Sequence, residues 1–133
     1  MKKILLIVGL LLFFTHQDIF AQAVISFEKN THDFGTFTEA KSQEAIFKFK
    51  NEGTEPLVIH QVLTTCGCTI AEFTKTPIEP GKEGEVKVTY NGKGKIFGKF
   101  KKGISVRANT KPYITRLYIM GDMIKDDSKK INN

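Results

Sequence analysis

The chain has 133 residues, with 20 Lys or Arg against 14 Asp or Glu, and its formal net charge at pH 7 is +6. A chain of this length has room for one domain with its own core and is too short for two once an N-terminal segment is set aside. A charge this small does not indicate a polyanionic ligand, so we expect no nucleic acid among the partners.

The N-terminal segment, residues 1–23, has the order of a signal peptide. Two lysines precede an apolar run from Ile4 to Phe14, and small residues follow at Ala21 and Ala23. The run is too short for a retained membrane helix, which needs about 20 residues. We therefore expect cleavage after Ala21 or Ala23, export to the periplasm or beyond the cell, and no membrane span afterwards.

Beyond residue 23, apolar residues alternate with polar ones, which is typical of strands with one buried face. In QEAIFKFKN, Ala45, Phe47 and Phe49 share one face, and Val86, Val88 and Tyr90 of EVKVTYN and Ile104, Val106 and Ala108 of GISVRAN repeat the pattern. The sequence predicts strands, in chain order, at residues 24–28, 32–37, 43–50, 57–64, 68–73, 84–90, 96–107 and 113–121.

Turn-forming residues separate these segments, and none of the segments carries the apolar stripe of a helix. Seven or eight short antiparallel strands at this spacing predict an all-β, Ig-like β-sandwich, with a barrel as the alternative. We expect the sandwich domain to span residues 24–122. The C-terminal stretch KDDSKKINN, residues 125–133, has one apolar residue in nine, so we expect a flexible tail over residues 123–133.

The chain has two cysteines, Cys66 and Cys68, which flank one glycine in TTCGCT. On an extended strand their Cα atoms would lie about 6.5 Å apart, near the upper limit for a disulfide, so a bond requires a bend that Gly67 could permit. The sequence leaves open a disulfide, buried thiols, or a redox or Cu(I) site. Zinc is not expected, because His32 and His60 lack a paired ligand spacing with the cysteines.

The segment NGKGKIFGKFKKG contains the densest positive patch of the chain, formed by Lys93, Lys95, Lys99, Lys101 and Lys102. Such lysines either protect an edge strand from aggregation or contact anionic envelope polymers or lipid head groups, and the first interpretation is favoured. The segment is not a phosphate-binding loop, because Lys93 stands in place of the first glycine and Phe100 in place of the hydroxyl residue. We therefore expect no nucleotide and no other cofactor.

Six motifs occur in order between residues 25 and 121: ISFEKNTHDFGTF, FKFKNEGTEPLVI, TTCGCT, PIEPGKEGEVKVTYN, FKKGISVRAN and TRLYIMG. Together they resemble an exported bacterial family, domain of unknown function 1573, which is common in the Bacteroidetes and similar in fold to Hydin-type and major-sperm-protein domains. The resemblance implies an Ig-like sandwich and an exported location. It implies a binding or scaffolding role only by analogy of fold.

No residue set indicates an enzyme, because the chain lacks a nucleophile elbow, paired histidines and a calcium loop. We expect an exported, non-enzymatic module with a structural or protein-binding role in the cell envelope. One alternative is a thiol-redox or Cu(I)-handling protein that uses Cys66 and Cys68. The other is a chaperone-like module that adds an edge strand to a client.

Overall fold

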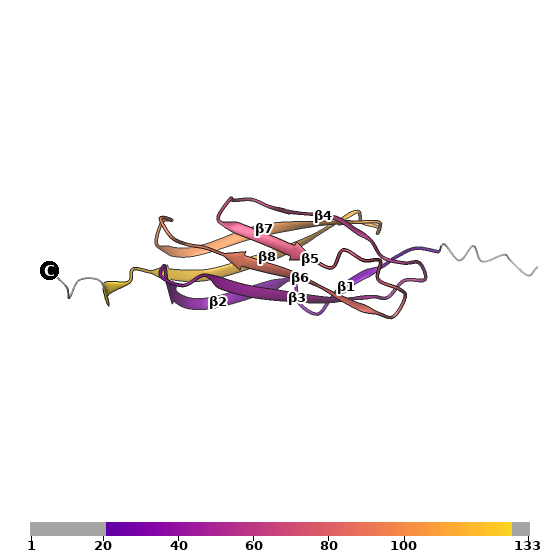
Figure 1. The fold of residues 1–133 in the computed structure, drawn as a ribbon, viewed down its shortest axis with the longest axis horizontal. Helices are drawn as coiled ribbons and strands as arrows, with labels where there is room; N and C mark the ends of the chain where they lie inside the picture. Colours follow the sequence, from indigo (N-terminus) through magenta and orange to yellow (C-terminus); the bar gives the residue numbers. More distant parts are fainter. Residues whose placement is uncertain (1–20, 129–133) are drawn as a thin grey trace, which may run out of the picture.

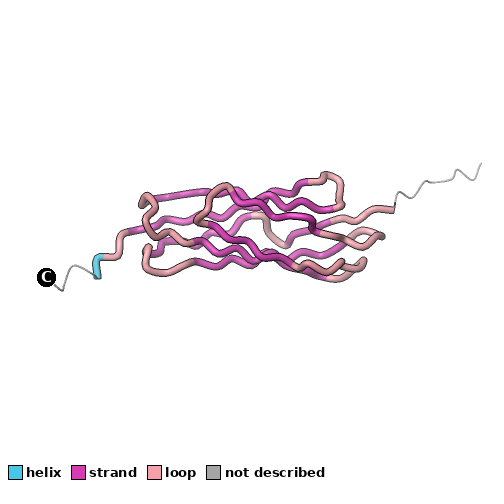
Figure 2. Tube along the Cα trace, turned by 45° about the horizontal axis from the view of Figure 1, so that its top comes forward, coloured by secondary structure: helices cyan, strands magenta, loops and turns pink. Residues whose placement is uncertain are grey.

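The computed structural model describes residues 21–128, and nearly all of the expected signal peptide lies outside this range. The described chain forms eight strands in two four-stranded sheets that pack face to face (Figures 1 and 2). The prediction of an all-β, Ig-like sandwich is therefore confirmed, and the sheets do not close into the alternative barrel.

The strands, in chain order, are β1 Ile25–Phe27, β2 Thr31–Thr38, β3 Gln43–Asn51, β4 Ile59–Thr64, β5 Thr69–Phe73, β6 Glu83–Tyr90, β7 Gly98–Ala108 and β8 Ile114–Ile124. One sheet has the order β1-β3-β6-β5, and the other has the order β2-β8-β7-β4. The short β1–β2 and β4–β5 connections both cross from one sheet to the other. One lateral edge of the sandwich therefore consists of β1 and β2, and the opposite edge consists of β4 and β5.

One strand pair differs from the antiparallel arrangement that we expected. β2 runs parallel to β8, whereas the other paired strands are antiparallel. After β1 the chain crosses to the second sheet instead of turning back on itself, so β2 reaches β8 in the parallel direction. Apolar alternation indicates which face of a strand is buried and carries no information about direction, which is why the sequence did not predict this pair.

β8 extends to Ile124, beyond the expected strand end at 121 and the expected domain boundary at 122. Met123 is fully buried, so the packed domain includes two residues of the expected tail. The apolar alternation of β8 is interrupted at Gly121, where an added methyl group would lie 2.9 Å from the ring of Phe37. The packing leaves no room for a side chain at position 121, and the glycine there breaks the apolar alternation from which the end of the strand was predicted.

The core lies between the two sheets and contains all the inward residues that alternation predicted for β3, β6 and β7. Tyr90 stacks on Phe100 across the sheets, with ring centroids 4.6 Å apart. Burial of each large apolar side chain contributes about 1.5 to 3 kcal/mol, so this interior supplies most of the stability of the fold.

The side-chain amide of Asn51, at the end of β3, is fully buried and has every hydrogen-bonding position filled. Its Nδ2 donates to the carbonyls of Glu55 and Ile78, at 2.7 and 2.9 Å. Its Oδ1 accepts from the N–H groups of Gly53 and Val24, at 2.9 and 3.3 Å. Asn51 therefore fixes the chain before β1 and two loops at the same end of the sandwich.

Candidate functional site

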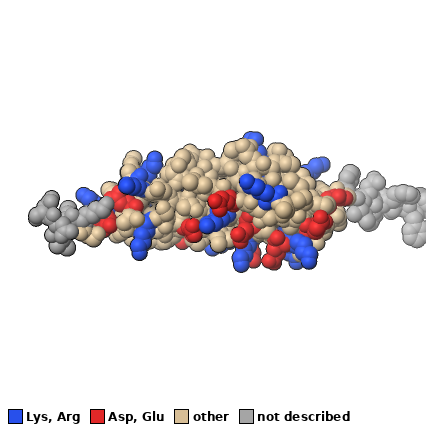
Figure 3. Space-filling model, in the orientation of Figure 1, with Lys and Arg blue, Asp and Glu red and all other residues tan. Residues whose placement is uncertain are grey.

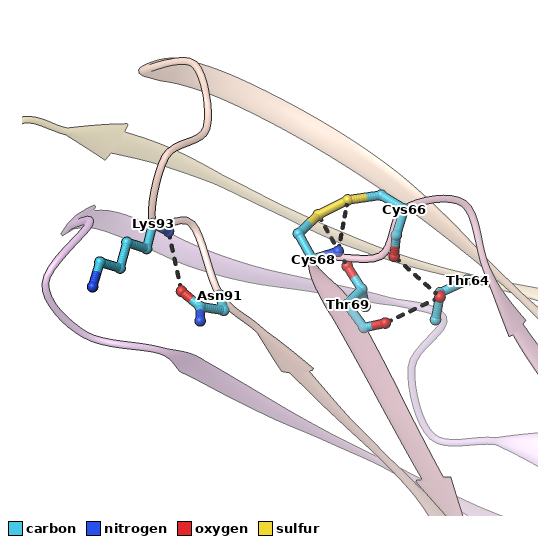
Figure 4. Close-up of a disulfide and its surroundings, with 6 residues drawn as sticks. All are labelled: Thr64, Cys66, Cys68, Thr69, Asn91 and Lys93. Atoms are coloured by element: carbon cyan, nitrogen blue, oxygen red, sulfur yellow. Dashed lines mark hydrogen bonds between the residues drawn. A yellow bond between two sulfur atoms is a disulfide. The ribbon is translucent and has the colours of Figure 1, made fainter.

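The two cysteines lie in the turn that joins β4 to β5 and crosses between the sheets (Figure 4). A disulfide joins Cys66 and Cys68, whose Cα atoms are 5.3 Å apart, which is one of the states that the sequence left open. Cys68 is buried in the core, and Cys66 is partly buried against it. The chain bends at Gly67 between the two cysteines, with a φ that is not positive, and a methyl group added there would meet no other atom within 4 Å.

Hydrogen bonds hold this turn in one shape. The Cys68 N–H points at Cys66 Sγ, 3.1 Å away, and the Thr69 N–H donates to the Cys66 carbonyl at 3.1 Å. The Thr64 hydroxyl lies 3.3 Å from the Cys66 carbonyl and 3.1 Å from the Thr69 carbonyl, so it donates to either oxygen (Figure 4). Together the disulfide and Thr64 occupy the main-chain groups at the start of β5.

Two hydrogen bonds, one just before β5 and one just after it, show which main-chain groups of β5 pair with β6. The Asn91 N–H donates to the Cys68 carbonyl at 2.8 Å, and the Thr74 N–H donates to the Glu85 carbonyl at 3.1 Å. In an antiparallel ladder, residues that exchange hydrogen bonds alternate with residues that do not. Every second residue from 68 to 74 therefore points its main-chain groups toward β6.

Ile70 and Glu72 are in phase with those positions, so their N–H and C=O groups pair with β6. The N–H and C=O groups of Ala71 and Phe73 point the other way, toward the free side of the strand. Because β5 ends its sheet, another strand could pair there. The turn satisfies Thr69 locally, so the open part of the edge begins at Ala71.

The segment at residues 56–71, which we call the uncharged edge, contains no Lys, Arg, Asp or Glu. It includes β4, the disulfide turn and the start of β5. Leu63 and Ile70 are 38% and 65% exposed, and they lie on the outer faces of the two sheets, on either side of the edge. Figure 3 shows the surface over the turn and the start of β5 without charged side chains. The uncharged run is visible in the sequence, but strand periodicity alone does not show that it lies at an open edge of the sandwich.

The five lysines of the predicted patch do not form one surface. Lys93 and Lys95 lie in the β6–β7 loop, and Lys99 and Lys101 point outward from β7; all four are exposed. Lys102 is partly buried and, by strand alternation, shares the inward side of β7. The structure therefore divides the predicted patch into four outward lysines and one that belongs to a different surface.

One of the outward lysines contacts a side chain of β8, and another lies opposite an acidic residue of β8 in the strand register. Lys99 lies opposite Asp122 in the β7–β8 register. The Nζ of Lys101 lies 4.6 Å from the centre of the Tyr118 ring, which is a cation–π contact. No comparable contact is recorded for the side chains of Lys93 and Lys95 within the part of the chain that the structure describes.

His32 on β2 and His60 on β4 lie on the two edge strands of one sheet. Among residues 21–128, no group of three or more His, Cys, Asp or Glu side chains could hold a metal ion. Partial burial lowers the pKa of His32 below its usual 6.5, the charge of Lys29 lowers it further, and Asp33 opposes both effects. The Lys29 Nζ lies 3.0 Å from His32 Nδ1.

Within residues 21–128 the structure has no helix with the length and apolar character that a membrane crossing requires. Comparison with known proteins gives one family. The family model described as "Protein of unknown function (DUF1573)" matches residues 25–123. No protein with a curated description matches the sequence.

Solved structures share the fold at low sequence identity. A protein of unknown function from Porphyromonas gingivalis W83 is 21% identical, with a TM-score of 0.66, over 77% of this chain and 48% of that one. The ASH/PapD-like domain 7 of human CEP192 is 14% identical, with a TM-score of 0.65, over 80% and 89%. The CupB2 chaperone of Pseudomonas aeruginosa is 12% identical, with a TM-score of 0.54, over 74% and 55%. The chain therefore spans about half the length of the Porphyromonas protein, and these likenesses show the fold alone.

Proposed function

The chain belongs to the DUF1573 family, and from this premise we propose that it is an exported, non-enzymatic module that binds protein partners in the cell envelope through its uncharged edge. The observation that carries the proposal is the open main chain of an edge strand at Ala71, where the uncharged edge ends, and at Phe73, which follows the exposed Glu72. Proteins that avoid association protect such edges with charged side chains, proline or bulges.

The mode of binding follows from these groups. An extended segment of a partner would pair its main chain with Ala71 and Phe73, and main-chain hydrogen bonds give affinity in this kind of recognition. Leu63 and Ile70, which are partly and largely exposed, would contact apolar side chains of the partner on either side of the added strand. No catalytic group is needed for this role.

Two further observations support the proposal. The order of residues 1–23, two lysines followed by an apolar run and small residues, favours export. The similar solved structures include a PapD-like domain and several proteins described as chaperones, which is consistent with a protein-binding module on this fold.

The test is photo-crosslinking in cell-envelope extracts, comparing the protein with two edge variants. Ala71→Pro removes the open N–H without breaking the ladder to β6, and Ile70→Lys places a charge beside the edge. Ile46→Lys is the matched control, because Ile46 is also exposed, at 45%, but lies on β3, which β6 separates from the edge at β5. We expect both edge variants to lose a crosslinked partner that Ile46→Lys retains.

Ile70→Pro serves as a check on the assignment of the open groups. The Ile70 N–H pairs with β6, so this variant should lose about 2 to 3 kcal/mol in the free energy of unfolding, whereas Ala71→Pro should lose less than about 1. Urea denaturation measures both. If the edge variants fold and still capture the same partners as the control, the edge is not the binding site.

A further inference from the structure

The β6–β7 loop, residues 91–97, carries an apolar pair that the sandwich does not bury. Ile96 is 94% exposed, the highest value among the large apolar side chains in residues 21–128, and Phe97 is 43% exposed. Apolar side chains on a soluble surface are common singly, but two adjacent ones at the tip of a loop mark a contact with another phase or molecule. In Figure 1 this loop lies at the end of the elongated molecule where the C-terminal residues leave the sandwich.

The conformation of the loop is fixed by its own hydrogen bonds. Asn91 Oδ1 accepts the Lys93 N–H at 3.1 Å (Figure 4), and the Lys95 N–H donates to the Gly92 carbonyl at 2.9 Å. Gly94 has a φ of 75°, which favours glycine. The exposure of Ile96 is therefore a feature of an ordered turn.

Positively charged side chains precede and follow the apolar pair along the chain. Lys93 and Lys95 precede it and Lys99 follows it, and all three side chains are exposed. The sequence contains no Asp or Glu from residue 86 to residue 121, so no acidic side chain lies within the loop or on β7. Lysines also appear at this end of the molecule in Figure 3, although acidic side chains lie near them.

We propose that the β6–β7 loop docks the protein on a bilayer that carries anionic lipids. Ile96 and Phe97 would enter the boundary between head groups and acyl chains, and the lysines around them would contact the anionic head groups, which is the combination that holds peripheral proteins at membranes. A soluble polyanion would use the lysines but would leave Ile96 without a role. This inference is independent of the proposed protein-binding edge, which lies on β4 and β5.

Vesicle binding tests the proposal. The protein would be the chain from residue 22 onward, which contains every strand and omits the apolar leader that would bind lipid by itself. Sedimentation would compare vesicles of phosphatidylcholine mixed with phosphatidylglycerol against vesicles of phosphatidylcholine alone. We expect binding to the mixed vesicles only, and a partial loss of that binding as salt is raised, because salt screens the lysines and leaves the apolar contact.

Paired variants separate the two contributions. Ile96→Ser should weaken binding about tenfold, which is the effect of losing one buried apolar side chain. Lys93→Gln with Lys95→Gln should weaken it by about 25-fold, at about fivefold for each lysine near the surface. Ile46→Ser, and Lys48→Gln with Lys50→Gln, are matched controls on the exposed face of β3 and should bind as the unchanged protein does.

A spectroscopic reporter gives an independent measurement. The chain has no tryptophan, so Phe97→Trp introduces a single emitter at the proposed point of insertion. Its emission should shift to the blue with the mixed vesicles and not with phosphatidylcholine alone. The proposal is overturned if the unchanged protein does not bind the mixed vesicles, or if it binds neutral vesicles equally well. It is also overturned if Ile96→Ser binds as tightly as the unchanged protein, because binding would then come from charge alone.

Discussion

The two lateral edges of the sandwich both expose main-chain groups, but they differ in how far those groups are protected from pairing with another chain. At each edge the chain crosses between the sheets, and in both cases main-chain groups of an edge strand point outward. On β1 these are the groups of Ile25 and Phe27, because Val24 and Glu28 pair with the chain of β3. The β1–β2 crossing carries Glu28 and Lys29, β1 has three residues, and a bulge interrupts β2.

The β4–β5 crossing has none of those charges and is closed by a disulfide instead. Charge, a short strand and a bulge are the usual means of preventing association at an edge. The fold does not by itself require an uncharged edge, because the same chain builds a protected one on the opposite side. The absence of charge at β4 and β5 is therefore a property of this sequence and not of the fold, as a binding role would require.

The largest effect should come from the amides that anchor the starts of the two edges. Asn51→Ala removes the hydrogen-bond partner of several main-chain groups, among them the Val24 N–H before β1. Because these groups would be left unsatisfied, the variant should lower the free energy of unfolding by about 3 kcal/mol or more. Asn109 anchors the chain before β4, accepting from the Val58 N–H at 2.8 Å and donating to the Pro56 carbonyl at 3.0 Å. Asn109 is exposed, so Asn109→Ala should cost less, about 1 kcal/mol. Urea denaturation of both variants measures the difference, and equal losses would contradict it.

The disulfide turn gives the next effect and sharpens what is special about the β4–β5 crossing. Replacing Cys66 and Cys68 with serine should lower the free energy of unfolding by about 1 to 3 kcal/mol, because a polar group replaces the buried Cys68 sulfur. The bond itself closes a very small loop, so it constrains the unfolded chain little.

The covalent state is checked by mass spectrometry of the unreduced protein after treatment with an alkylating reagent. We expect no labelling of either cysteine and a mass lower by two hydrogens. Stoichiometric Cu(I) binding that disappears in the double variant, together with an unchanged melting temperature, would reverse the structural interpretation and support the metal-handling alternative.

The smallest effect should be a pH dependence at the protected edge. The pKa of His32 is lowered in the folded state, so folding favours its neutral form. The stability that this contributes is complete above the usual value of 6.5 and is lost as the pH falls through the lower folded value. His32→Gln on β2 should flatten the fall in stability, measured by urea denaturation across this range, with His60→Gln on β4 as the matched control. A slope unchanged by His32→Gln would place the pH dependence elsewhere.

Strand periodicity predicted the sandwich and its core, because a buried face imposes the alternation that Phe47, Val88 and Val106 share. It did not predict the parallel β2–β8 pair, since direction leaves no mark on the pattern. The division of the lysines was available from alternation, which places Lys102 opposite Lys99 and Lys101.

The candidate site was harder to predict than the fold. The uncharged run from residue 56 to residue 71 is visible in the sequence, but whether it faces solvent depends on which strands end the sheets. The open groups of Ala71 follow only from the register with β6. Likewise, an Ile-Phe pair in a strand-rich chain is ordinarily core, and only the structure places Ile96 outside.

The parallel pairing of β2 with β8 also governs when the fold can form. It joins Thr31 to Tyr118 and Thr38 to Ile124, so the second sheet closes only after almost the whole described chain is available. Contacts between distant parts of a chain form slowly, because a long loop must be ordered before they can stabilise it. A chain emerging N-terminus first, from a ribosome or across a membrane, would hold β2 without its partner until the last strand arrives. During that interval, even the edge that the finished protein protects is open to misassociation.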